Sequence, residues 1–197
     1  MYLIFDTETA GIPDDYNAPH SDIENWPRMV QLAWESFDTH ERRIGANSHV
    51  IRPDGFKIPK DAESVHGIST ATAKRIGKPV ADVLDEFLEA LAESSILVAH
   101  NLNFDTGILG AEFYRVGIKR PFRHLAQICT MRETTDFCAL PGPYGSKWPK
   151  LDELHHKLFK KKVTKSHDAG ADTATCAKCF FELKRLGIIR ITKKRRA

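Results

Sequence analysis

The sequence lacks any apolar run long enough to cross a membrane, and the run at residues 3–5 ends at Asp6. It also lacks the basic start and long apolar core of a secretory signal. Neither an internal repeat nor a low-complexity segment is present, which excludes repeat arrays and long disordered linkers. We therefore expect a cytoplasmic globular protein with no membrane partner.

Cysteine is scarce, with four residues in the whole chain. Cys176 and Cys179 form a C-x-x-C pair, but no second pair completes the four ligands of a structural zinc site. Thiols of an intracellular protein are normally reduced. We therefore expect free cysteines that pack in the core.

Neither sign of charge dominates the whole chain, whose net charge is +3, but the charges are unevenly distributed. Residues 157–197 contain thirteen Lys or Arg and three Asp or Glu, which gives a net charge of +10. A basic region of this kind suits a polyanion such as nucleic acid. We expect residues 1–188 to form one domain and residues 189–197 to form a basic C-terminal tail, consistent with the length of 197 residues.

The hydrophobic pattern predicts an α/β protein. Apolar runs and alternation predict strands at residues 2–8, 29–37, 44–51, 95–101 and 127–131. Helical spacing predicts helices at residues 80–92, from 105 onward, 151–159 and 172–186. A hairpin followed by strand–helix units favours a mixed sheet covered by helices, with polar groups at strand ends lining a ligand crevice.

Two acids, Asp6 and Glu8, end the first apolar strand. Residues i and i+2 of a strand point to the same face, about 7 Å apart. Two carboxylates at the edge of a core repel each other and lose hydration, so one takes a proton or a cation lies between them. Oxygen ligands suit Mg²⁺ or Mn²⁺ rather than zinc or copper.

Two further acids follow buried segments in the same way. Asp105 follows the strand at 95–101, and Asp172 lies on the apolar stripe of the last helix, four residues before Cys176. Local packing explains neither acid, so convergence on a divalent cation is the simplest interpretation. His167 is close enough in sequence to lean over this site, and a histidine ring can take a proton from water.

These residues resemble the motifs of the DEDDh family of 3′–5′ exonucleases, within the ribonuclease H-like superfamily. D-x-E appears as Asp6-Thr7-Glu8, the H-N-x-x-F-D type motif as residues 100–105, and H-x-A-x-x-D as residues 167–172. The similarity covers residues 2 to about 186. It is strongest to the proofreading branch, the epsilon subunits of bacterial DNA polymerase III and the PolC-type exonuclease domains, through "VHGI" at residues 65–68.

The resemblance implies a ribonuclease H-like mixed five-stranded sheet flanked by helices, and hydrolysis with two divalent ions, Mg²⁺ or Mn²⁺. It implies that Asp6, Glu8, Asp105 and Asp172 bind the ions and that His167 is the general base. It also implies substrate contacts from Thr7, Val65, His66 and Phe104, although packing explains Val65 and Phe104 equally well.

The expected function is hydrolysis of DNA from its 3′ end, single strands preferred, with release of nucleoside 5′-monophosphates in proofreading or repair. The expected partners are nucleic acid with a free 3′ end and a DNA polymerase. Two alternatives stay open: a 3′-end exoribonuclease or oligoribonuclease, and a non-catalytic module that binds nucleic acid or a polymerase. Lys160–Lys162 and Lys165 fit phosphate contacts or a solvated charge run. For Tyr144 and Trp148, in the turn-rich segment 140–150, we expect packing rather than stacking on bases.

Overall fold

The computed structural model describes residues 1–119, 121–122, 124–163 and 167–191. Its centre is a five-stranded sheet in the order β3-β2-β1-β4-β5. β1, β2 and β3 are antiparallel neighbours, whereas β1, β4 and β5 run parallel. The strands of this sheet are β1 (Tyr2–Thr9), β2 (Met29–Phe37), β3 (Arg43–Val50), β4 (Ile96–Ala99) and β5 (Ala126–Cys129). The predicted mixed five-stranded sheet is therefore confirmed.

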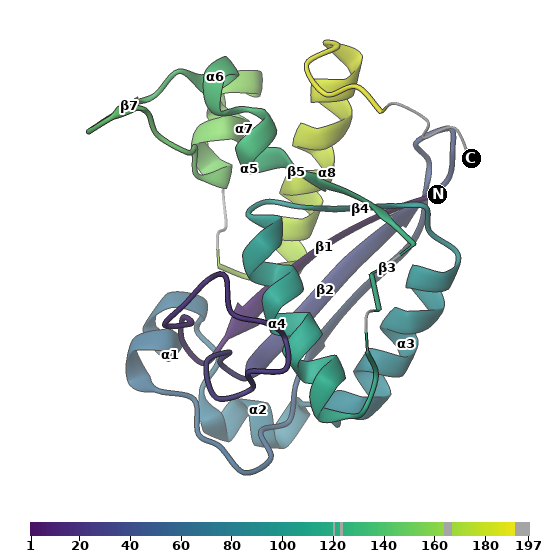
Figure 1. The fold of residues 1–197 in the computed structure, drawn as a ribbon, viewed down its shortest axis with the longest axis vertical. Helices are drawn as coiled ribbons and strands as arrows, with labels where there is room; N and C mark the ends of the chain where they lie inside the picture. Colours follow the sequence, from purple (N-terminus) through teal and green to yellow (C-terminus); the bar gives the residue numbers. More distant parts are fainter. Residues whose placement is uncertain (120, 123, 164–166, 192–197) are drawn as a thin grey trace.

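Helices cover both faces of the sheet, with α4 in front and α8 behind in Figure 1. A two-stranded hairpin projects from the helices α5 to α7. The remaining elements are α1 (Lys60–His66), α2 (Thr70–Ile76), α3 (Val80–Ala92), α4 (Leu102–Arg115), α5 (Thr130–Glu133), α6 (Thr135–Cys138), β6 (Pro141–Gly142), β7 (Gly145–Ser146), α7 (Leu151–Phe159) and α8 (Ala169–Arg185).

The side chains of β1 alternate between two cores. Leu3 and Phe5 lie in the cluster formed with α3 and α4, where the Phe5 and Phe87 rings lie 5.6 Å apart. Ile4 faces the other way and packs with Cys176 and Phe180 of α8. Full burial of each such side chain contributes about 1.5–3 kcal/mol to folding. The central strand is thus fixed from both sides, and its polar carboxyl end lies between the two helical layers.

Several predicted boundaries differ from the structure. Neither α1 nor α2 is among the predicted helices, and α1 has no apolar stripe because it buries none of its residues. β5 ends at Cys129 and α5 begins at the next residue, inside the predicted strand 127–131. α8 begins at Ala169, three residues before its predicted start, because Asp168 caps it by accepting from the Ala171 N–H at 3.0 Å.

The cysteines are buried free thiols, and burial raises the pKa of Cys179 to about 12. No helix among the described residues has the length and apolar character to span a membrane. Ile189 is buried against α8, so packing continues into the predicted tail segment 189–197. Residues 192–197 of that segment and Lys165 lie outside the described residues.

Candidate active site

Asp6 and Glu8 lie on the α8 side of β1, because they continue the alternation in which Ile4 faces α8. On the neighbouring strand β2, Ala33 is paired with Asp6 and Gln31 with Glu8. The register shifts between Glu8 and the next residue, where the strand ends. The two acids therefore stand at the carboxyl end of the central strand and face the start of α8.

Asp105 reaches the same edge from the other helical layer. It lies in the first turn of α4, where the helix dipole favours a carboxylate, and its residue is 2% exposed. The Thr7 backbone N–H and hydroxyl both donate to Asp105 Oδ1, at 3.1 and 2.8 Å. Thr7, between the two strand acids, thus orients the third acid.

The start of α8 is attached to β2 at the two residues that pair with the strand acids. The Ala169 N–H donates to Gln31 Oε1 at 3.2 Å, and the Thr173 hydroxyl donates to the Ala33 carbonyl at 3.3 Å. Asp172 lies between these two anchors along the helix. The register of α8 on the sheet therefore brings Asp172 to Asp6 and Glu8.

His167 precedes α8 and has a left-handed backbone, with φ at 60°. Its N–H donates to Asp172 Oδ2 at 2.8 Å, so the bend before the helix is tied to the helix acid. The side chain of His167 is exposed. One ligand atom each of Glu8, His167 and Asp172 lies within 4.8 Å of the others.

The four acids hold protons more tightly than ordinary carboxyl groups. Burial, followed by repulsion from Asp105, Asp172 and Glu8, raises the pKa of Asp6. Burial, followed by repulsion from Asp172 and Asp105, raises the pKa of Glu8 to about 8. Burial raises the pKa of Asp105 to about 7, although the Thr7 hydrogen bonds act in the opposite direction. Burial is also the main reason why the pKa of Asp172 is raised.

Glu112, a buried acid elsewhere in the protein, differs from these four because neighbouring arginines balance its charge. Glu112 is 1% exposed, yet Arg28 and Arg115 lie 2.9 and 3.2 Å from its Oε1, and the Met29 N–H donates to the same atom. The acids at the end of β1 instead repel one another. Carboxylate oxygens in this arrangement are the donors that Mg²⁺ and Mn²⁺ prefer, so the residues present fit a divalent cation.

The residues predicted to bind substrate differ in their exposure and in their contacts. Val65 is 53% exposed on α1, and the neighbouring His66 lies close enough to His167 for the two charges to interact. His66 Nδ1 accepts from the Ile68 N–H at 3.0 Å, and burial lowers the pKa of His66. Phe104 is half-buried, with its ring 6.3 Å from the ring of Tyr16.

His100, the first residue of the motif at residues 100–105, makes structural contacts. Its ring nitrogens lie 3.0 Å from the Thr130 hydroxyl and 2.9 Å from the Pro149 carbonyl. Burial lowers the pKa of His100 to about 4, so the ring is neutral at physiological pH. Sequence reasoning missed the anchoring residues Gln31 and Thr173, since neither belongs to a motif.

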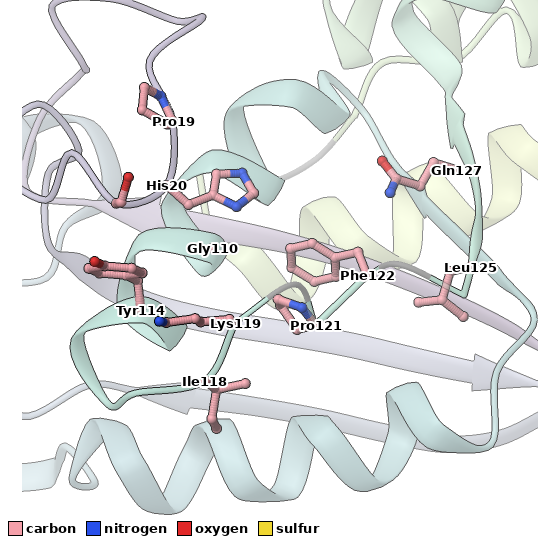
Figure 2. A pocket seen from close by; sticks show the side chains of 11 residues that line it. Pro19, His20, Gly110, Tyr114, Ile118, Lys119, Pro121, Phe122, Leu125 and Gln127 are labelled. Atoms are coloured by element: carbon pink, nitrogen blue, oxygen red, sulfur yellow. The ribbon is translucent and has the colours of Figure 1, made fainter.

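A well-formed cavity lies away from the acids. It has a volume of about 660 Å³ and lies between residues 19–21, α4 and the segment that leads to β5. Figure 2 shows Tyr114, Phe122 and Gln127 around it, with the His20 ring above Gly110. A side chain at Gly110 would collide with that ring. The cavity contains none of the four acids.

Residues 3–180 match the sequence model of the family described as Exonuclease (RNase_T). The epsilon subunit of DNA polymerase III from Salmonella typhimurium is 34% identical over 187 residues, which cover 92% of this chain and 70% of the relative. A PolC-type DNA polymerase III from Streptococcus sanguinis is 30% identical over 119 residues, which cover 60% of this chain and only 7% of that polymerase.

Solved structures agree on the fold. Escherichia coli exonuclease I in complex with a dT13 oligonucleotide superposes with a TM-score of 0.73 at 21% identity, over 94% of this chain. The match covers 42% of that chain, so this protein spans about two fifths of the exonuclease I chain. A zinc-bound E. coli exonuclease I–ssDNA complex gives the same TM-score. The chain therefore belongs to the Exonuclease family and is a DEDDh-type 3′–5′ exonuclease that resembles the epsilon subunit of DNA polymerase III.

Proposed function

We propose that this exonuclease hydrolyses single-stranded DNA from its 3′ end and depends on two divalent ions, Mg²⁺ or Mn²⁺. The observation that carries the proposal is the convergence of acids from β1, α4 and α8 whose pKa values are all raised. DNA is favoured because the relatives include a DNA polymerase subunit and an exonuclease solved with a DNA oligonucleotide.

In this proposal Asp6, Glu8, Asp105 and Asp172 hold the ions. When bound, divalent ions in such a site activate a water and stabilise the negative charge that develops at the phosphate. Two of the acids are oriented by hydrogen bonds: Thr7 orients Asp105, and the His167 N–H orients Asp172. A structure of this fold, an E. coli exonuclease I–ssDNA complex, has been solved in a zinc-bound form, which supports the use of a divalent ion.

His167 is proposed to be the general base. Its ring takes a proton from the attacking water, while the new bond forms to phosphorus and the bond from phosphorus to the 3′ oxygen breaks. The leaving 3′ oxygen is protonated, so the products are a shortened strand and a nucleoside 5′-monophosphate. The exposed position of His167, beside Glu8 and Asp172, supports this role.

The terminal nucleotide is proposed to lie between α1 and the start of α4. Val65 is exposed enough to contact the terminal base, His66 follows it, and Phe104 lies one residue before Asp105. Thr7 contributes through Asp105, because its N–H is already donated to that carboxylate. Proofreading beside a DNA polymerase, or repair, is the proposed setting, and it rests on the relatives' names.

The substrate is tested with matched single strands of DNA and RNA and with a DNA duplex, each with Mg²⁺ or EDTA. We expect the DNA single strand to be shortened fastest and nucleoside 5′-monophosphates to accumulate. Faster digestion of the RNA strand would contradict DNA as the substrate and would favour a 3′-end exoribonuclease. Binding of both strands without shortening of either would support a non-catalytic module and contradict the proposal.

A further inference from the structure

The hairpin β6–β7 presents a tyrosine at its tip. Gly142 pairs with Gly145, and Pro143 and Tyr144 form the two-residue turn between them. Proline at the first turn position and glycine after the turn are typical of a tight turn, and Gly145 has φ at 117°, where other residues are strained. The Lys147 N–H donates to the Leu140 carbonyl at 2.9 Å and closes the hairpin below the turn.

Both aromatic rings of this hairpin segment are exposed, which shows that the prediction of packing was wrong. Tyr144 is 103% exposed and Trp148 is 58% exposed, whereas Trp26 and Trp34 are each 2% exposed. The Arg132 guanidinium lies over the Trp148 ring, 5.7 Å from its centre. A cation on one face holds the ring in place, and an exposed aromatic face is what a nucleic-acid base stacks on.

The hairpin is attached to the edge that carries the acids. At its base, the Pro149 carbonyl accepts a hydrogen bond from His100 Nε2 at 2.9 Å. His100 directly follows β4 and precedes the helix that carries Asp105. Tyr144 is five residues from Pro149, so it lies within about 17 Å of that attachment at the rise of an extended chain.

Cations lie next to the hairpin along α7. A cavity of about 590 Å³ begins at Leu140, the residue that closes the hairpin, and continues along α7. Lys157, Lys160 and Lys162 line it together with the acids Asp152 and Glu153. Glu153 is paired with Lys147 of the hairpin at 2.6 Å, so the pair fixes the hairpin on α7. The three lysines of this cavity are cations that a phosphate backbone beside the hairpin could contact.

We propose that Tyr144 and Trp148 form a stacking platform for the bases of the single strand whose 3′ end enters the active site. Lys157, at the end of α7, and Lys160 and Lys162, which follow it, contact the phosphates between those bases. The combination of exposed rings with adjacent cations is the arrangement that holds single strands without sequence preference. This inference rests on the proposed function, since it assigns the platform to the same strand.

The platform is tested by binding of a fluorescent oligothymidylate of about twelve nucleotides to the full chain in EDTA, so that hydrolysis is prevented. Tyr144→Ala with Trp148→Ala is expected to weaken binding about tenfold or more, while binding of a trinucleotide changes less than about twofold. The matched control, Tyr114→Ala, removes a tyrosine from the distant cavity and leaves both affinities unchanged. Tyr144→Phe with Trp148→Phe keeps the rings and retains binding.

Tryptophan fluorescence gives a second readout, because Trp148 is exposed and the other two tryptophans are buried. The oligothymidylate is expected to quench the emission of the wild type, and Trp148→Phe is expected to bind with the quench removed. Equal affinity of the double alanine variant and the wild type, or no quench, would overturn the platform. The two proposals can be told apart. If the alanine variants lose binding but the wild type shortens no strand with Mg²⁺, the stacking platform is supported and the proposed hydrolysis is contradicted.

Discussion

Thr7 holds Asp105 through two hydrogen bonds: its backbone N–H and its hydroxyl both donate to Asp105 Oδ1, at 3.1 and 2.8 Å. The bonds join residues that lie 98 positions apart in the sequence. Since Thr7 stands between Asp6 and Glu8 on β1, the same three-residue stretch supplies two acids and orients a third. The separation of these acids is therefore set by the packing of α4 on β1.

Thr7→Val removes the hydroxyl bond and leaves the backbone bond. We expect the free energy of unfolding to fall by about 1–3 kcal/mol, because a buried acceptor loses a donor. Strand digestion is expected to slow by about 10–100-fold, the usual effect of losing a residue that orients a metal ligand. Thr7→Ser keeps the hydroxyl and serves as the matched control. Equal activity of the valine and serine variants would contradict the orienting role.

Asp105→Asn removes one of the repelling charges and keeps a side-chain oxygen in place. We expect digestion to fall by at least about 100-fold, since an ion ligand is lost. The metal-free protein at about pH 8 is expected to become more stable, because the raised pKa of Asp105 reflects a carboxylate that is unfavourable when ionised. Thermal unfolding in EDTA measures this, with Asp85→Asn on the exposed face of α3 as control. A less stable Asp105→Asn protein would contradict the electrostatic account.

The pH dependence of stability has a definite sign. In the folded protein the pKa of Asp105 is about 7 and that of Glu8 about 8, whereas unfolded carboxyl groups ionise near pH 4. Between these values the folded state binds more protons, so their stabilising contribution is complete below about pH 4 and is lost as the pH rises toward 8. In EDTA, we expect the contribution of these groups to stability to decrease between about pH 4 and 8.

Mg²⁺ competes with those protons, so its stabilising effect is expected to increase with pH over the same range. Melting temperatures with and without saturating Mg²⁺, measured at both ends of the range, test this. A shift that is independent of pH would contradict metal binding by these carboxyl groups.

His167→Ala distinguishes a general base from a metal ligand. If His167 is the base, we expect digestion to slow by about 10²–10⁴-fold while the stabilisation by Mg²⁺ stays unchanged. His40→Ala, in the exposed turn after β2, is the matched control. Loss of the Mg²⁺ effect in His167→Ala would instead make His167 a ligand, as its place beside Glu8 and Asp172 also permits.

Three of the acids could be predicted from the sequence because the local period of a strand or helix sets the face on which each one lies. Asp6 and Glu8 follow from the two-residue period of a strand, and Asp172 follows from its position four residues before Cys176 on a helical stripe. The partners of these acids depend on which strands are neighbours and in which register. The Ala169–Gln31 and Thr173–Ala33 bonds join residues about 140 positions apart, and no local pattern specifies them.

Surface elements were the least predictable part. α1 buries no residue, so it has no apolar stripe, although Pro59 before it and Gly67 after it are ordinary helix boundaries. Tyr144 was expected to pack within its proline-containing, turn-rich segment. The turn at Pro143 instead directs it into solvent, and the sequence contains no periodicity over so short a hairpin.

The most direct test of the central claim is digestion of a single DNA strand labelled at its 5′ end by the wild type and by Asp6→Asn, with Mg²⁺ and with EDTA. The account predicts a ladder that shortens from the 3′ end in the wild type with Mg²⁺ only, and an intact strand with a folded Asp6→Asn variant. Shortening that persists in EDTA or in Asp6→Asn would contradict a metal site built on the acids at the end of β1.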